Sequence, residues 1–185
     1  MKFIFVFLID SGGWLKIAGY SVQQPGPALT TLSFLTDQVS KLSLLKSAQP
    51  VALTSSAVKR LAESTKAAQL RFTCNGVRPV DFATSTNEKG AKAFNYFIDA
   101  EDITRPLACG SFYRMSNDNS FIAKQCNNWR DSRWSRSGSG SLEHNIYFYN
   151  AYVPHKYHIN GNHLCDDDFD DPGFDVPKEW AYYIR

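Results

Sequence analysis

Residues 55–74, SSAVKRLAESTKAAQLRFTC, change from a helical pattern to a strand pattern within one short stretch. Val58 and Leu61 have the spacing that gathers apolar side chains on one face of an amphipathic α-helix. Leu70–Cys74 is rich in β-type residues and is followed by an Asn-Gly turn, as strands often are. The stretch predicts a helix over Ser55–Gln69 and a strand directly after it.

A further helix is predicted upstream, from leucines that recur at steps of three and four residues. Leu29, Leu32, Leu35 and Val39 have this spacing, and more leucines continue the apolar side to position 45. Pro50 separates this segment from the helix described above.

The start of the chain supports two interpretations. Lys2–Ile9 (KFIFVFLI) has one basic residue and then seven apolar ones, as a secretory leader has, although no small-x-small cleavage pattern follows. Alternatively, Phe3–Ile9 is a first β-strand, followed by a Ser-Gly-Gly turn and a second strand over Trp14–Tyr20. In that case the chain could be the distal domain of a longer exported protein.

From Gly110 onward the sequence favours β-structure, with aromatic and β-branched clusters separated by Asn, Asp, Gly and Pro. A hairpin is predicted with strands over Ala108–Met115 and Asn119–Cys126. The chain would reverse at residues 117–118, Asn-Asp, because both residue types tolerate the left-handed backbone of such turns.

This hairpin predicts how the four cysteines pair. Its register places Cys109 directly across from Cys126, on a rung where Cα atoms lie about 4.5 Å apart. A disulfide accepts Cα separations of about 4.4 to 6.8 Å, so the bridge fits. Cys74 and Cys165 then remain as the second predicted bridge.

Two more strands are predicted near the end of the chain, over Asn145–Tyr152 and Glu179–Arg185. The Gly/Ser-rich residues 136–141 are expected to form an exposed loop. The predicted fold class is therefore α+β, as a single binding domain over residues 1–185. Helices in the N-terminal half would pack on a mainly antiparallel sheet, followed by a loop-rich, disulfide-stapled C-terminal half.

Composition limits the classes of function. With 43% hydrophobic and 21% charged residues over 185 positions, the chain is typical of one globular domain. Its net charge of +2 is too small to steer it to nucleic acid, and no apolar run reaches the roughly 18 residues of a membrane span. An even number of cysteines without C-x-x-C pairs suits disulfides in a secreted or cell-surface protein; reduced cytosolic thiols are the alternative.

An acidic segment, residues 165–175 (CDDDFDDPGFD), carries six carboxylates. Asp166, Asp168 and Asp170 alternate as at the opening of a calcium-binding loop, and Ca²⁺ prefers such oxygen ligands. The turn glycine and closing glutamate of an EF-hand are missing. We expect these aspartates to bind Ca²⁺, with a solvated acidic loop or a docking patch for a basic partner as the alternatives.

Three histidines near this segment raise the alternative of a zinc-dependent hydrolase: His155, His158 and His163. They lie on an irregular segment without the fixed spacing that zinc hydrolases use. The chain also lacks a nucleophile elbow, a phosphate-binding loop and a dinucleotide fingerprint. We therefore predict a binding protein and not an enzyme.

Aromatic, arginine and histidine side chains in the C-terminal half could form a ligand-binding surface. Residues 127–136, NNWRDSRWSR, interleave tryptophans with arginines, which can stack on sugars, bases or a partner's acidic surface. A core position for both tryptophans is the alternative. The predicted ligand-binding residues are Trp129, Arg130, Trp134, Tyr152, Tyr157, His158 and His163.

Residues 11–18, SGGWLKIA, resemble the Gly-Gly-Trp strand near the start of fibrinogen C-terminal-like and intelectin-like domains. Trp180–Arg185 also resembles their short final strand. Departures are the missing cysteine before the Gly-Gly-Trp, the short chain and the position of the acidic segment. The resemblance implies an extracellular recognition domain, often calcium-dependent, that binds glycans or acetylated groups.

The expected function is a lectin-like or adhesive domain that recognises a carbohydrate-bearing surface, with a glycan or cell-surface ligand. The chain could form a homo-oligomer or be attached to a stalk. Two alternatives stay open: a protein-recognising tip module of a fibre or pilus, and the metal-dependent hydrolase.

Overall fold

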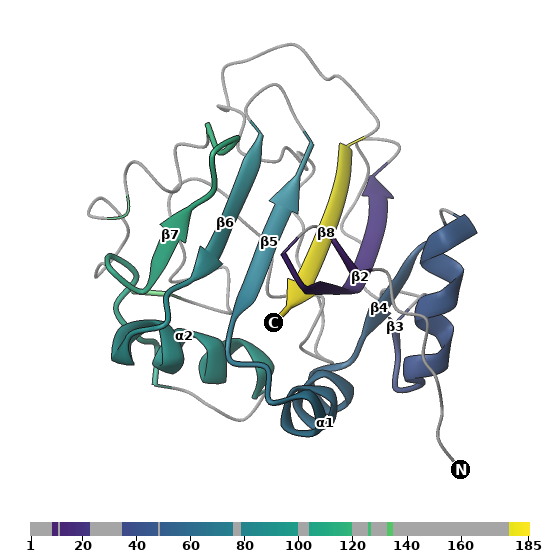
Figure 1. Ribbon diagram of the computed structural model, residues 1–185, viewed down its shortest axis with the longest axis horizontal. Coiled ribbons are helices and arrows are strands. Elements are labelled where there is room, and N and C mark those ends of the chain that lie inside the picture. The colour runs from purple at the N-terminus through teal and green to yellow at the C-terminus, as the bar shows by residue number, and fades with distance from the viewer. Residues whose placement is uncertain are drawn as a thin grey trace.

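One β-sheet organises the part of the chain that the computed structural model describes, which comprises residues 9–10, 12–22, 35–47, 49–75, 79–99, 104–119, 126, 133–134 and 178–185. The strand order is β3-β4-β2-β8-β5-β6-β7, and β1 also pairs with β2 (Figure 1). The strands are β1 (Ile9–Asp10), β2 (Trp14–Val22), β3 (Leu35–Thr36), β4 (Val51–Leu53), β5 (Leu70–Cys74), β6 (Val80–Thr84), β7 (Phe112–Arg114) and β8 (Lys178–Ile184). The helices are the 3-10 helix η1 (Val39–Ser47), α1 (Ser55–Thr65) and α2 (Glu88–Ile98).

Strand pairing is antiparallel between all neighbours except β3 and β4, which are parallel. β8 lies between β2 and β5, as its yellow ribbon shows in Figure 1. The predicted α+β class, with helices and a mainly antiparallel sheet, is confirmed.

Glycines make the turn that leads into β2. Gly12 and Gly13 have φ angles of +107° and +78°, a region that L side chains rarely adopt. The turn brings Asp10 opposite Trp14, so β1 and β2 form a hairpin. The predicted strand from Trp14 is confirmed and continues to Val22. The sequence left open whether the start of the chain is a secretory leader or a first strand. Except for Ile9, the residues concerned lie outside the described part.

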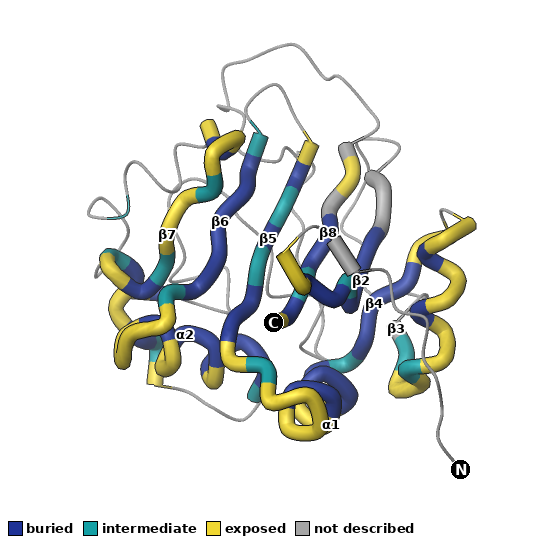
Figure 2. Tube along the Cα trace, viewed as in Figure 1, coloured by how far each residue is buried: buried dark blue, intermediate teal, exposed yellow. Residues whose placement is uncertain are grey.

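The core lies between the sheet and the helices, and Phe72 of β5 is near its centre. Ring centroids of Phe82 and Phe97 lie 5.2 Å from that of Phe72, and the Tyr182 centroid lies at 5.6 Å. Because Phe97 belongs to α2, this face of the sheet is the one that α2 covers. Figure 2 shows burial along β6 and exposure on the outer side of α2. The predicted strand over Leu70–Cys74 is confirmed.

Helix α1 begins at the predicted residue but ends earlier than predicted. Thr54 is the N-cap, because its hydroxyl accepts a hydrogen bond from the Ala57 N–H. Lys66 takes a left-handed conformation, with φ +58°, at the C-terminus. The Ala68 N–H then donates to the Arg185 carbonyl over 2.8 Å. The prediction of helix to Gln69 was wrong because residues 68–69 pair with the chain after β8.

The single helix predicted from Leu29 to position 45 was also wrong. Leu35 pairs with Ala52 of β4, so a strand interrupts the predicted helix. The helical pattern holds only over η1, where Leu42 and Leu45 are buried. The parallel pairing of β3 with β4 outweighs the local preference for helix. Leu29 and Leu32 lie outside the described residues.

The predicted hairpin is only partly correct. Its first strand is shorter than predicted, because the Ser111 N–H donates to the Ala108 carbonyl in a tight turn and β7 starts at Phe112. A turn does follow Met115, since the Asp118 N–H donates to its carbonyl over 3.2 Å. β7 pairs with β6, and residues 120–125 lie outside the described part. No helix in the described part is long and apolar enough to cross a bilayer.

Candidate functional site

A polar pocket lies on the face of the sheet opposite to α2. Residues directly across from each other in an antiparallel pair point to the same face. Arg71 pairs with Tyr183, and Thr73 pairs with Asp81, so these side chains alternate with Phe72 and its core neighbours. The pocket has a volume of about 310 Å³. The polar residues of the described part that line it are Arg71, Thr73, Asn75, Asp81, Asn117, Glu179 and Tyr183.

A buried ion pair is part of the pocket lining. Arg71 donates from Nε to Asp81 Oδ1 and from Nη2 to Asp81 Oδ2, both over 2.8 Å. The Asp81 side chain is 1% exposed, and that of Arg71 is 12% exposed. A bidentate pair of this kind fixes the planes of the guanidinium and the carboxylate. The remaining donors and acceptors of both groups are therefore held in one orientation.

The ion pair is held from the β7 side by a second carboxylate. The Asp81 backbone N–H donates to Asp118 Oδ1 over 2.9 Å, and Arg114 Nε donates to Asp118 Oδ2 over 2.6 Å. The Met115 N–H donates to the Asp81 carbonyl over 2.9 Å. Connected hydrogen bonds of this kind restrain the pocket before any ligand arrives.

Aromatic rings lie beside the ion pair. The guanidinium carbon of Arg71 is 5.5 Å from the Tyr183 ring centroid and 5.9 Å from that of Trp14. Arg185 contributes a second guanidinium, 4.4 Å from the Trp14 ring. These distances are typical of cation–π contacts. Trp14, from the Gly-Gly-Trp motif, is only 1% exposed and supports Arg71 from outside the pocket lining.

The charges of the pocket are largely compensated. Asp81 is paired with Arg71. Glu179 forms an ion pair with Lys16, with 3.1 Å between Glu179 Oε1 and Lys16 Nζ. The Asn75 and Asn117 amides, both exposed, can each donate and accept hydrogen bonds. A lining whose described charges are compensated and which is rich in donors and acceptors suits a neutral ligand with many hydroxyl groups better than an ion.

Most of the predicted site residues fall outside the described part of the chain. They are Trp129, Arg130, Tyr152, His155, Tyr157, His158, His163, Asp166, Asp168 and Asp170. Within the residues that the structure does describe, no cluster of three His, Cys, Asp or Glu side chains could hold a metal ion. The calcium and zinc hypotheses concern the other residues and stay predictions.

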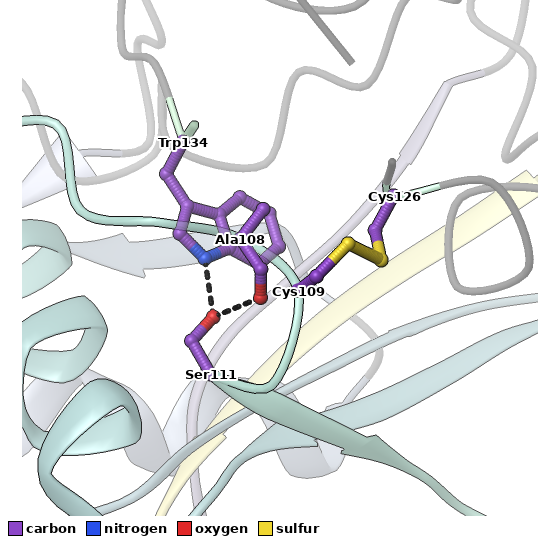
Figure 3. Close-up of a disulfide and its surroundings, with 5 residues drawn as sticks. All are labelled: Ala108, Cys109, Ser111, Cys126 and Trp134. Atoms are coloured by element: carbon purple, nitrogen blue, oxygen red, sulfur yellow. Dashed lines mark hydrogen bonds between the residues drawn. A yellow bond between two sulfur atoms is a disulfide. The ribbon is translucent and has the colours of Figure 1, made fainter. Parts of the chain in front are cut away.

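Trp134 is the predicted ligand-binding residue that the structure describes. It is 3% exposed, and its ring centroid lies 5.1 Å from that of Phe97. Its Nε1–H donates to Ser111 Oγ over 2.7 Å, and Ser111 Oγ donates to the Ala108 carbonyl (Figure 3). Trp134 therefore occupies the core position that the sequence left open as an alternative.

The predicted Cys109–Cys126 disulfide is confirmed. Its Cα atoms are 5.5 Å apart, and the bridge lies beside Trp134 and Ser111 (Figure 3). Cys74 is 1% exposed on the core side of β5. Its predicted partner, Cys165, lies outside the described residues.

No protein-family model, curated protein or solved structure matches this chain.

Proposed function

We propose that the chain is a lectin-like or adhesive domain that recognises a carbohydrate-bearing surface, and that the polar pocket binds a neutral sugar. The observation that carries this proposal is the Arg71–Asp81 pair, held beside the Tyr183 ring in a pocket whose described lining residues carry no large excess charge.

Each feature of the pocket matches a property of sugars. Hydroxyl groups both donate and accept hydrogen bonds, and the lining offers amide, carboxylate and guanidinium partners for them. A ring such as Tyr183 provides an amphipathic contact surface for the apolar side of a ligand. The volume of about 310 Å³ is at the lower end for ligand sites, which favours a small unit such as one sugar ring.

In this proposal the chain acts as a secreted or cell-surface protein, because structural disulfides such as Cys109–Cys126 persist in oxidising compartments. Its C-terminal half would be loop-rich and stapled by disulfides, including Cys74–Cys165. Calcium at Asp166, Asp168 and Asp170 would be a second element of recognition. The resemblance of residues 11–18 to fibrinogen-like and intelectin-like domains points to the same class of ligand.

A glycan array, followed by calorimetric titration of the sugars that bind, tests the proposal. Asn117→Ala and Asn75→Ala remove exposed amides from the pocket, and we expect each to weaken sugar binding by about tenfold, the effect of one lost hydrogen bond of about 1.4 kcal/mol. Gln38→Ala removes an exposed amide next to η1, outside the described pocket lining, and is the matched control, which should bind as the unmodified chain does.

Two results would contradict the proposal. An array without any bound glycan would favour a protein-recognising tip module. If the pocket variants bound the sugar with the same affinity as the unmodified chain, the sugar would have to bind at another site. Titration with Ca²⁺ and a chelator control tests the calcium element separately. Stoichiometric zinc in the purified protein would instead support a hydrolase that uses His155, His158 and His163.

A further inference from the structure

A second cavity, here called the α2 groove, lies between α2 and the chain around residues 104–107. Its volume is about 560 Å³. Glu88, Lys89 and Lys92 line it from the helix, and Leu107 and Arg133 line it from the other side. None of these residues belongs to the polar pocket, so the groove offers a separate surface.

Backbone and cap contacts fix both walls of the groove. The Asn87 side chain caps α2 by accepting from the Gly90 N–H over 2.9 Å, and its Nδ2 donates to the Gly110 carbonyl over 3.1 Å. On the opposite wall, Leu107 forms an isolated β-bridge with Arg133, and the Trp134 N–H donates to the Pro106 carbonyl over 2.9 Å. The groove is therefore formed before a partner binds, which reduces the cost of binding.

The described residues that line the groove carry a positive net charge. Among them are three basic residues, Lys89, Lys92 and Arg133, and one carboxylate, Glu88, which gives +2. Glu88 is paired with Lys92 at 2.7 Å, and both side chains are well exposed, at 83% and 65%. Exposed ion pairs of this kind are weak, so Lys92 can leave Glu88 and pair with a carboxylate of a ligand.

An apolar contact accompanies these charges. Leu107 is 43% exposed and is one of three exposed large hydrophobic side chains in the described part of the chain. Pro106 and the methylene stems of the lysines extend this surface. A ligand that fits must therefore combine negative charge with an apolar group.

We propose that the α2 groove binds a short acidic segment of a protein partner, in which an apolar side chain contacts Leu107 and flanking carboxylates meet Lys89 and Arg133. A sulfated or uronic polysaccharide would satisfy the charges but would leave Leu107 without an apolar contact. The observations therefore favour the peptide. This site does not depend on sugar binding at the polar pocket.

The test uses a fluorescein-labelled peptide in which one leucine is flanked on both sides by aspartates, with fluorescence anisotropy as the readout. The comparison peptide carries asparagine in place of each aspartate. We expect Lys89→Glu and Arg133→Glu each to weaken binding of the acidic peptide by about tenfold, since charge reversal replaces attraction with repulsion. Lys41→Glu, an exposed lysine on η1, is the matched control with unchanged binding.

Glu88→Gln gives a result that misfolding could not mimic. This substitution removes the carboxylate from the groove lining, so we expect binding of the acidic peptide to tighten by about threefold. Equal binding of the two peptides, or equal loss in Lys41→Glu and Lys89→Glu, would overturn the proposal. Binding of heparin without binding of the acidic peptide would overturn it as well, in favour of a polysaccharide.

Discussion

Asp81 shows how a single buried charge supports the polar pocket. Its carboxylate takes two hydrogen bonds from Arg71, and its backbone is held by Asp118 and Met115. A charge in this position is tolerated only because its partner is present. The contacts that stabilise the sheet therefore also hold the lining of the pocket in place.

Replacing Asp81 by asparagine should lower the free energy of unfolding by about 3 kcal/mol, because Arg71 is then left buried without its counter-charge. Urea unfolding measures this loss. Glu179→Gln is the matched control, since Glu179 is 50% exposed in its pair with Lys16 and should change stability by less than about 1 kcal/mol. Similar losses in both variants would show that burial of the Arg71–Asp81 pair has no special importance.

At the residue scale, the sequence predicted a contact across a turn but did not predict contacts between residues of separate strands. Cys109 and Cys126 were paired correctly from a local hairpin register, even though β7 is shorter than that hairpin required. The polar pocket was missed because it needs β5, β6 and β8 in one sheet. Arg71 and Thr73, which alternate with buried Phe72, were the available signal.

The start of helix α1 depends on a small polar cluster. The Thr54 hydroxyl caps the helix at Ala57 N, and both Thr54 and Ser56 donate to the Asp37 carboxylate. Asp37 lies between β3 and η1, so this cluster ties three elements together. One substitution here should therefore affect more than the helix cap.

Thr54→Ala should lower the free energy of unfolding by at least about 1 kcal/mol, the usual cost of a lost N-cap, because the hydrogen bond from Thr54 to Asp37 is lost as well. Thermal and urea unfolding check this value. Ser64→Ala on the same helix is the control, because its hydroxyl only donates back to the Leu61 carbonyl and alanine favours helix. A loss in Ser64→Ala as large as that in Thr54→Ala would contradict the capping role.

Asp37 should make this corner of the fold sensitive to acid. Hydrogen bonds from Thr54 and then Ser56 lower the pKa of Asp37 below its ordinary value, with a further contribution from Arg60. A lowered pKa gives stability that is present above the unfolded-state pKa of about 3.9 and is lost as the pH falls through the folded value. The melting temperature of Asp37→Asn should therefore lie below that of the unmodified chain at neutral pH and converge with it below pH of about 4. A constant difference across this range would exclude the carboxylate as the cause.

Elements with strong local signals were predictable, and those that depend on distant pairing were not. The strand Leu70–Cys74 and the start of α1 follow from residue spacing, although the N-cap of α1 is Thr54 and not Ser55, the cap that the sequence predicted. Helix α2 was missed, although Asn87 as a cap followed by apolar residues such as Phe94 and Phe97 would have identified it. β3 could not be found from leucine spacing, because its pairing with β4 decides its conformation.

On the scale of the whole molecule, the Cys109–Cys126 bridge fastens the loop beside Trp134 to the core. The two cysteines are 17 residues apart in sequence. Closing a loop of this length stabilises a protein by about 3 kcal/mol in the chain-entropy model. The Cys109→Ser/Cys126→Ser double variant should lose about this much in urea unfolding. Reduction should raise the intact mass of the unmodified chain by two hydrogens more than it raises that of the double variant, and an equal rise in both would contradict the bridge.

The position of β8 at the centre of the sheet has a consequence during synthesis. Within the described strands, hydrogen bonding between β3-β4-β2 and β5-β6-β7 passes only through residues 178–184. A ribosome releases β2 and β5 long before it releases this strand, and each half-sheet then has an unpaired edge. The two halves of the sheet can therefore pair only after residues 178–184 have left the ribosome.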